Sequence, residues 1–386
     1  MTPLRFLVTP QVRALHGSRV DDFGAALLRS DVLADDVVLA FRALPHGQGW
    51  AQLQRALAGD RTSLHPAIAT FVDSASTTPT WVDRETIASA GALLLRAGPL
   101  GGLVLGLSSL PTGYASPAGN KPLAFSGRLQ EQAPRRLMET ARFVHAVCSP
   151  DGMRPGGEGF QATLKVRLMH AQVRRLLWDS GRWNTDAWGL PINQHDLVAT
   201  TLLFSIVLLN GLRTFGLEIS TREAEAYIHL WRYVGWLMGA EPALLPATEA
   251  DAFRIGDLIQ LTQGEPDADS RALTDALLHW RLKAAKTPWE RRLAEASLPF
   301  GRAGAHLLLG KRLATQLGIE RSLAELGIPV LRRMLSGIER VRLVSSRAHA
   351  FAIQRGDEAW RRVVEQGLQG VPAEFRPPSS LSDRRA

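Results

Sequence analysis

The chain has 386 residues, and 45% of them are hydrophobic, which supports a large core and argues against a disordered protein. Basic residues exceed acidic ones by 8, yet no basic block, zinc-ligand spacing or RNA-binding aromatic motif accompanies the excess, so we expect no nucleic-acid partner. The single cysteine, Cys148, excludes an intramolecular disulfide and a cysteine-based metal cage.

The N-terminal and apolar segments bear on localisation. The opening residues, MTPLRFLVTPQVRALHG, lack the long apolar run and cleavage site of a secretory signal, so we expect a cytoplasmic protein. The apolar stretch 88–110 is interrupted by Arg96 and Pro99, and 197–209 is shorter than the roughly 18–20 residues of a spanning helix. We therefore expect no transmembrane segment, and a peripheral membrane contact stays open.

Helical periodicity dominates the chain. Apolar residues recur at three- and four-residue steps in 21–44, 135–148, 162–178, 223–239, 270–285, 303–317 and 321–344. Alternating strand patterns are rare, and short Pro- and Gly-containing loops separate the helical segments. The sequence predicts an all-α protein with an N-terminal extension (1–20), one helical domain (21–370) and a flexible tail (371–386).

The helix predicted over 135–147 carries a polar group on one face. Arg136, Glu139 and Thr140 lie at three- and four-residue steps, followed by Phe143. They would offer a ligand pocket one cation, one acid or base and one hydroxyl. The alternative is a solvated face with an intrahelical Arg136–Glu139 ion pair.

The helix predicted over 162–178 places a histidine between two arginines. Arg167, His170 and Arg174 fall on one face of a helix that is otherwise rich in Leu, Met and Val. A neutral imidazole on an apolar helix can hold haem iron, and the arginines could bind the haem propionates. Alternatively His170 is a packed histidine, and the arginines reach solvent or pair with acidic residues, for which the candidates are Asp179, Asp186 and Glu158.

His195 has a structural interpretation. It lies in PINQHDL, where Asn193 or Asp196 could cap the apolar helix that follows. No HxxE or HExxH spacing supports a non-haem iron triad.

Several segments together resemble a known family. They are LPTGYASPAGNKPLAFSGRL (110–129), RRLMET (135–140), KVRLMHAQVRRLLW (165–178), WGLPINQHDLVATTLLFS (188–205) and YIHLWRYVGWLMGAEPALLP (227–246). As a set, in this order, they are similar to the haem-dependent oxygenase family that includes the rubber oxygenases of the latex-clearing type and the mycophenolic acid pathway oxygenase MpaB.

The resemblance implies a globin-like helical core with additional helices, a haem b cofactor, and dioxygen-dependent cleavage or oxidation of a hydrophobic, isoprenoid or lipid-like substrate. His170 matches the proximal iron ligand, and Arg136 and Thr140 match polar residues of the distal helix. Glu139 stands where rubber-cleaving members have a lysine, and the upstream loop GYASPAGNKPLAF lacks their carboxylate, which argues against rubber itself as the substrate.

Two other functions stay open at this point. The chain could be a haem protein that senses or stores rather than catalyses, or a helical module that binds a hydrophobic ligand without haem. The sequence leaves the oligomeric state open as well.

Overall fold

The computed structural model describes residues 2–126 and 128–368, and the side chains of all of these except 126, 128–133 and 368. Every regular element in this part of the chain is a helix, and no strand occurs in it. The expected all-α fold is therefore confirmed. The predicted tail, 371–386, lies outside the described residues.

The helices are short in the first third of the chain and longer afterwards. Up to residue 126 they are α1 (Pro10–His16), α2 (Arg19–Ala26), α3 (Val32–Ala43), α4 (Gln48–Leu57), α5 (Pro66–Ser76), α6 (Arg84–Ala90), α7 (Ala92–Ala97), α8 (Pro99–Val104), the π-helical turn η1 (Leu105–Ser109), α9 (Leu110–Tyr114) and α10 (Lys121–Ser126). The central helices are α11 (Arg128–Cys148), α12 (Glu158–Asp179), α13 (Thr185–Trp188), α14 (Gln194–Phe204), α15 (Ile206–Thr214), α16 (Thr221–Leu237) and α17 (Glu249–Leu261). The last are α18 (Ala268–Leu278), α19 (Trp280–Ala284), α20 (Pro288–Gln316), the 3₁₀ turn η2 (Leu323–Gly327), α21 (Ile328–Leu343) and α22 (Ser346–Leu368).

The helix predicted over 21–44 is two helices in the structure. Between α2 and α3, the carbonyl groups of Leu27 and Arg29 accept hydrogen bonds from the backbone of 190–194 instead of closing helical turns. Asp31 then caps α3 by accepting from the Ala34 amide. Periodicity alone missed this break because the apolar pattern continues across it.

Two other predicted helices differ in extent. The helix predicted over 135–148 is the second part of α11, which continues through Pro134. The segment 321–344 divides into η2 and α21, where Ser322 and Glu325 form a capping box around the 3₁₀ turn.

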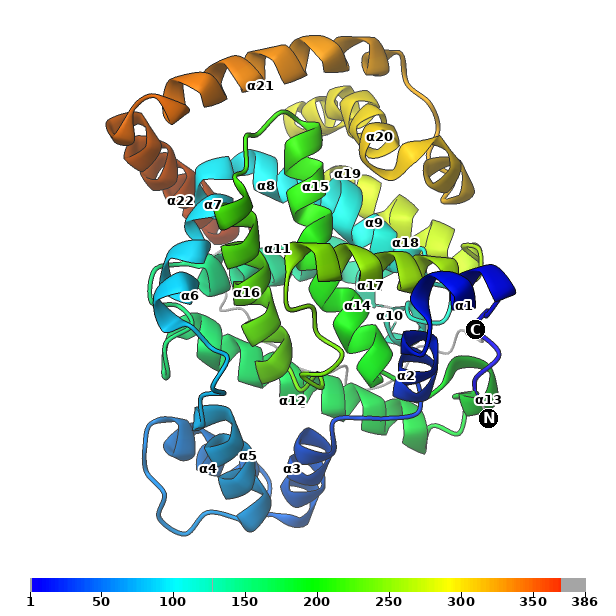
Figure 1. Cartoon of the computed structure of the whole chain (residues 1–386), viewed down its shortest axis with the longest axis vertical. Helices are drawn as coiled ribbons and strands as arrows, with labels where there is room; N and C mark the ends of the chain where they lie inside the picture. Colours follow the sequence, from blue (N-terminus) through cyan, green and yellow to red (C-terminus); the bar gives the residue numbers. More distant parts are fainter. Residues whose placement is uncertain (1, 127, 369–386) are drawn as a thin grey trace.

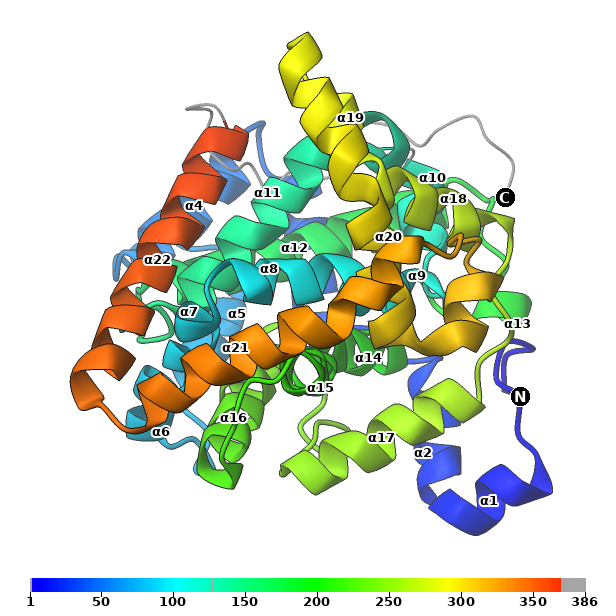
Figure 2. The ribbon, with the colours of Figure 1, turned by 90° about the horizontal axis from the view of Figure 1, so that it is seen from above.

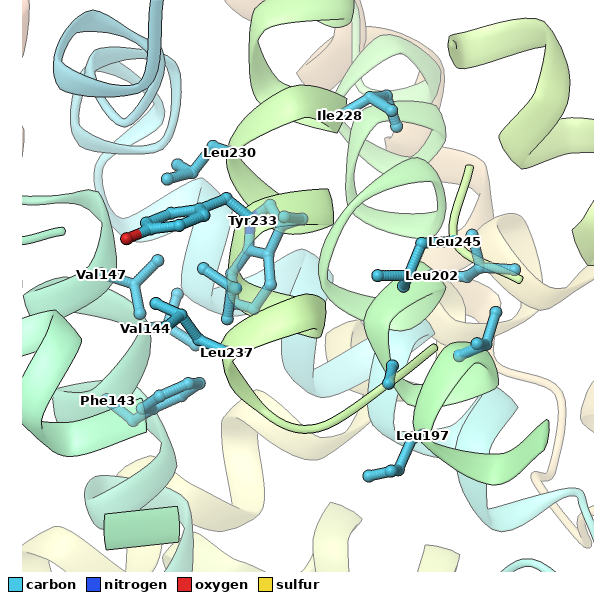
Figure 3. Close-up of a cluster of buried hydrophobic side chains, with 14 of the residues drawn as sticks. Phe143, Val144, Val147, Leu197, Leu202, Ile228, Leu230, Tyr233, Leu237 and Leu245 are labelled. Carbon is cyan, nitrogen blue, oxygen red and sulfur yellow. The ribbon is translucent and has the colours of Figure 1, made fainter. Parts of the chain in front are cut away.

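The core lies between the long central helices. α11 packs on α12, and α16 packs on both α12 and α14. Figure 3 shows a cluster of their buried apolar side chains: Phe143, Val144 and Val147 from α11, Leu197 and Leu202 from α14, Ile228, Leu230, Tyr233 and Leu237 from α16, and Leu245 from the loop that follows.

Peripheral helices flank this core at both ends. Helices α3, α4 and α5 gather at one end of the molecule, and α21 crosses the opposite end (Figure 1). Viewed onto that end, α21 runs across the front of the molecule (Figure 2).

The expected N-terminal extension is packed against the body of the protein. The buried guanidinium of Arg5 pairs with Asp196 on α14 at 2.8 Å. The amides of Leu4 and Arg5 also donate to the carbonyls of Asp186 and Ala187. Residues 2–20 therefore belong to the folded unit.

One helical segment, Gln194–Thr214, is long and apolar enough to span a bilayer, and the bent pair Arg84–Ala97 and Pro99–Tyr114 passes the same test of length and composition. The two halves of the pair meet at 86°, and 56% of the single segment is buried inside the protein. Core helices of large soluble proteins have the same length and apolarity.

Candidate functional site

His170 lies in the middle of α12, and its half-buried ring has no hydrogen-bond partner among the described residues. The helix is fixed in the core by Leu164, Leu168, Ala171 and Leu177, which are fully buried. The Nδ1 atom of His170 is inaccessible to solvent, and no described residue forms a hydrogen bond with either ring nitrogen. A buried polar nitrogen without a partner is costly, and the Nδ1 atom of His170 lacks a partner that the described residues do not supply.

Burial and charge keep the His170 imidazole neutral. The pKa of His170 is lowered to about 4, mainly by burial and in addition by the positive charges of Arg174 and Arg136. A neutral imidazole has a free lone pair at neutral pH, which is the form that binds iron. A bond to a metal would satisfy one of the two ring nitrogens, so the chemistry of the residue fits the haem expected from the sequence.

The structure gives Arg167 a different role from the predicted propionate contact. Its guanidinium forms a buried, two-pronged ion pair with Asp31 at 2.6 and 2.7 Å. It also donates to the Leu237 carbonyl and lies over the Phe71 ring. The pairing alternative therefore describes Arg167 better, although Asp31 was not among the acidic residues that the sequence suggested.

Gly239 makes room for this buried ion pair. Its φ of +92° is a conformation that L side chains rarely adopt, and a β-carbon there would collide with the Asp31 carboxylate and with Arg167. The close approach of the backbone at Gly239 thus closes the pair off from solvent.

Arg174 is also paired, but less completely. Its Nε donates to Asp35 at 2.8 Å and its Nη1 donates to the Ile192 carbonyl at 2.7 Å. Its Nη2 is buried and has no hydrogen-bond partner in the described part of the protein. The propionate role thus stays a prediction for Arg174, with one donor still to be satisfied.

Arg136 approaches His170 from α11, the neighbouring helix. Its positive charge lowers the pKa of His170. It also acts on Tyr114, where burial raises the pKa of the phenol and the charge of Arg136 opposes the rise. The guanidinium on α11 thus acts electrostatically on both the imidazole on α12 and the phenol at the end of α9.

Tyr114 was missed by the sequence reasoning, although it lies in the segment 110–129. It is buried. Asn120 holds the end of α9 by donating to the Tyr114 carbonyl at 2.9 Å and to Ser270 at 3.0 Å. A tyrosine inside a short loop-like segment carries no periodic signal, so nothing local distinguished it from a packing residue.

Glu139 and Thr140 are engaged within α11. The Glu139 carboxylate pairs with Arg135 at 3.1 Å, one helical turn before it, instead of with Arg136 as the alternative proposed. The Thr140 hydroxyl donates to the Arg136 carbonyl at 3.0 Å. Neither contact directs these side chains toward His170, so their catalytic role stays a prediction.

The other central histidines have structural partners. His195 contacts Asp196 at 3.2 Å and packs edge-on against Phe6 and Phe23, while Asn193 caps α14 as expected. His145 contacts Asp357 on α22 at 2.6 Å. No group of three His, Cys, Asp or Glu side chains within the described residues could hold a metal ion.

Comparison with known protein families shows which family the chain belongs to. The family described as "ER-bound oxygenase mpaB/B'/Rubber oxygenase, catalytic domain" matches residues 85–340. The chain belongs to this family. The match extends past both ends of the region 110–246 on which the resemblance rested, and it includes the helices that carry Tyr114, Arg136 and His170, which are α9, α11 and α12.

Similarity to two known proteins agrees with that assignment. A rubber oxygenase from Streptomyces sp. (strain K30) is 27% identical over 233 residues, which are 59% of this chain and 56% of that protein, so the chain matches about half of its length. The structure of latex clearing protein in the closed state matches with a TM-score of 0.54 and 20% identity, covering 88% of this chain and 91% of that one. At this identity the likeness concerns the fold, and it supports the expected helical architecture.

Proposed function

We propose that the chain is a haem b-dependent oxygenase that uses dioxygen to cleave or oxidise a hydrophobic, isoprenoid or lipid-like substrate. The observation that carries the proposal is His170, a neutral, half-buried imidazole without a hydrogen-bond partner among the described residues, whose pKa is lowered in part by the charge of Arg136. In a chain that belongs to an oxygenase family, an iron ligand explains this ring better than packing does.

The residues around His170 would each contribute a distinct property. Haem b, when bound, would supply the redox-active iron at which dioxygen is activated. His170 would hold the metal through its neutral ring. Arg136 would place a positive charge near the site, which favours negative charge developing on oxygen. The phenol of Tyr114 is protonated at neutral pH, so it can donate a hydrogen bond but provides no base.

The apolar surroundings support a hydrophobic substrate. Phe143 of α11 and Trp231 of α16 are buried in the apolar core and contact each other edge-on. A ligand that entered between these helices would meet apolar side chains, which exclude water and add little polar recognition. The carboxylate missing from the upstream loop argues for a substrate other than rubber, so we propose a shorter isoprenoid or lipid-like molecule.

Replacing His170 tests the haem assignment. Purified wild-type protein reconstituted with haemin is expected to show an intense Soret band, and His170→Ala is expected to lose it and to recover it with added imidazole. The matched control is His145→Ala, since His145 is another half-buried histidine with a partner of its own on α22. A wild-type protein that folds and stays colourless with haemin would point to the haem-free hydrophobic-ligand module instead.

Replacing Arg136 tests catalysis separately from haem binding. Arg136→Ala is expected to lower oxygen-dependent turnover of a short isoprenoid by about 100-fold, the usual effect of losing one preorganised electrostatic group, while haem content stays near wild type. Arg136→Lys should retain part of the activity because it keeps the charge. Equal losses of haem and turnover would make Arg136 a cofactor-binding residue, and haem binding without any turnover in the wild type would favour a sensor or store.

A further inference from the structure

Helix α21 exposes an unusual amount of apolar surface. Met334, Ile338 and Val341 recur at four- and three-residue steps and are 61%, 66% and 61% exposed, so they form one outward stripe. The turns at both ends continue it: Leu323 and Leu326 in η2 and Val344 after α21 are more than 80% exposed. Contiguous apolar surface of this kind marks an interaction site.

Exposed arginines occupy another face of the same helix. Arg332, Arg333 and Arg340 are exposed, and none of them has an ion pair or hydrogen bond with another described residue. With Pro329, Ser336 and Gly337 they line an open surface hollow of about 470 Å³. The single acidic residue of α21, Glu339, is buried and already paired, so this helix exposes no acidic side chain.

The protein holds this face outward in a fixed orientation. Glu339 on the inner side of α21 pairs with Arg96 of α7 at 2.7 Å and with Arg342 at 2.7 Å. Arg342 also donates to the Glu218 carbonyl at 3.3 Å. This buried network anchors the helix by its polar side, while the apolar stripe stays exposed. Helix α21 itself lies at the end of the molecule (Figures 1 and 2).

We propose that α21, with η2 and the turn after it, docks the protein on a bilayer that contains anionic phospholipids. An apolar stripe beside unpaired basic side chains is the pattern of a helix that lies in the plane of a membrane interface. The arginines complement lipid phosphates, and the stripe reaches the acyl boundary. A nucleic acid would use the charges but would leave the stripe in water.

Vesicle binding tests the proposal without reference to haem. Wild-type protein should co-sediment with vesicles of phosphatidylcholine plus phosphatidylglycerol, weakly with phosphatidylcholine alone, and less at high salt because screening weakens the arginine contribution. Arg333→Ala combined with Arg340→Ala should weaken binding about 30-fold, the combined effect of two basic side chains at an anionic surface. Ile338→Glu should reduce binding to the anionic vesicles to the weak level seen with phosphatidylcholine alone.

Matched variants at the opposite end of the molecule control for net charge and surface apolarity. Arg55→Ala combined with Arg61→Ala removes the same charge near α4 and α5, and Leu39→Glu alters an exposed leucine of α3; both should bind like wild type. A fluorescent label can show which end of the molecule contacts the membrane, because the native Cys148 is buried and should not react. The emission of an environment-sensitive dye on Ile338→Cys should shift to the blue with anionic vesicles. The emission of the same dye on Leu39→Cys should not shift.

Three results would overturn the proposal. One is a wild-type protein that does not bind the anionic vesicles. Another is an equal loss of binding in the variants at the far end. The third is a dimer in sedimentation velocity that Ile338→Glu converts to a monomer, because a second copy of the chain would then cover the stripe.

Discussion

Asp31→Ala is expected to lower the free energy of unfolding by about 3–5 kcal/mol, the usual cost of leaving one charge of a buried ion pair without its partner. The pair with Arg167 is almost fully enclosed, with side-chain exposures of 5% for Asp31 and 7% for Arg167. The substitution also removes the N-cap of α3, which adds to the loss. Chemical denaturation followed by far-UV circular dichroism measures the change.

Two further variants isolate the cause of the Asp31 effect. Asp36→Ala removes an exposed carboxylate from the same helix and should leave stability within about 0.5 kcal/mol of wild type. Asp31→Ala combined with Arg167→Met should recover much of the loss, because it removes the stranded charge and keeps the apolar bulk. If the double variant is less stable than Asp31→Ala alone, the buried guanidinium is satisfied by something other than Asp31.

The same variants separate structure from cofactor binding. If Arg167 serves the buried pair, haem bound per folded molecule should be unchanged in the double variant. If the double variant binds less haem per folded molecule than the wild type, the result supports the propionate role of Arg167 that the helix pattern predicted. The absorption spectrum at constant folded protein distinguishes the two.

The central helices could be predicted from sequence because their signals are local. The three-residue and four-residue steps around His170 and Arg136 predict two helices with these residues on defined faces, and the structure packs those helices together. The neutral state of His170 also follows from placing it on an apolar helix. Family membership, first inferred from five short segments, extends over most of the chain.

The partners of the arginines could not be predicted in the same way. Asp31 and Asp35 are more than 130 residues away from Arg167 and Arg174 along the chain, and only the folded arrangement of α3 against α12 brings them together. The acidic residues nearest in sequence were the natural candidates, but a helix directs its side chains outward to other elements. The burial of Tyr114 was missed for the same reason, because it packs with Leu273 and Leu277 of α18, far away in the sequence.

Glu339→Ala is expected to be comparably destabilising, by about 3–5 kcal/mol, because one carboxylate serves two buried guanidinium groups. Arg96 would keep its second partner, Glu223, at 2.9 Å. Arg342 would keep only the Glu218 carbonyl and His349 as neutral acceptors. Most of the cost therefore falls on Arg342 and on the attachment of α21.

Because the loss falls mainly on Arg342, Glu339→Ala should loosen α21 more than the central helices. Amide hydrogen exchange should rise in α21 before it rises in α12 or α16, because α21 packs mainly against its chain neighbours η2 and α22. Glu325→Gln, which alters the solvent-exposed pair with Arg321, should leave exchange in α21 unchanged. Equal exchange in α21 of wild type and Glu339→Ala would mean that apolar contacts, and not the buried network, hold this helix in place.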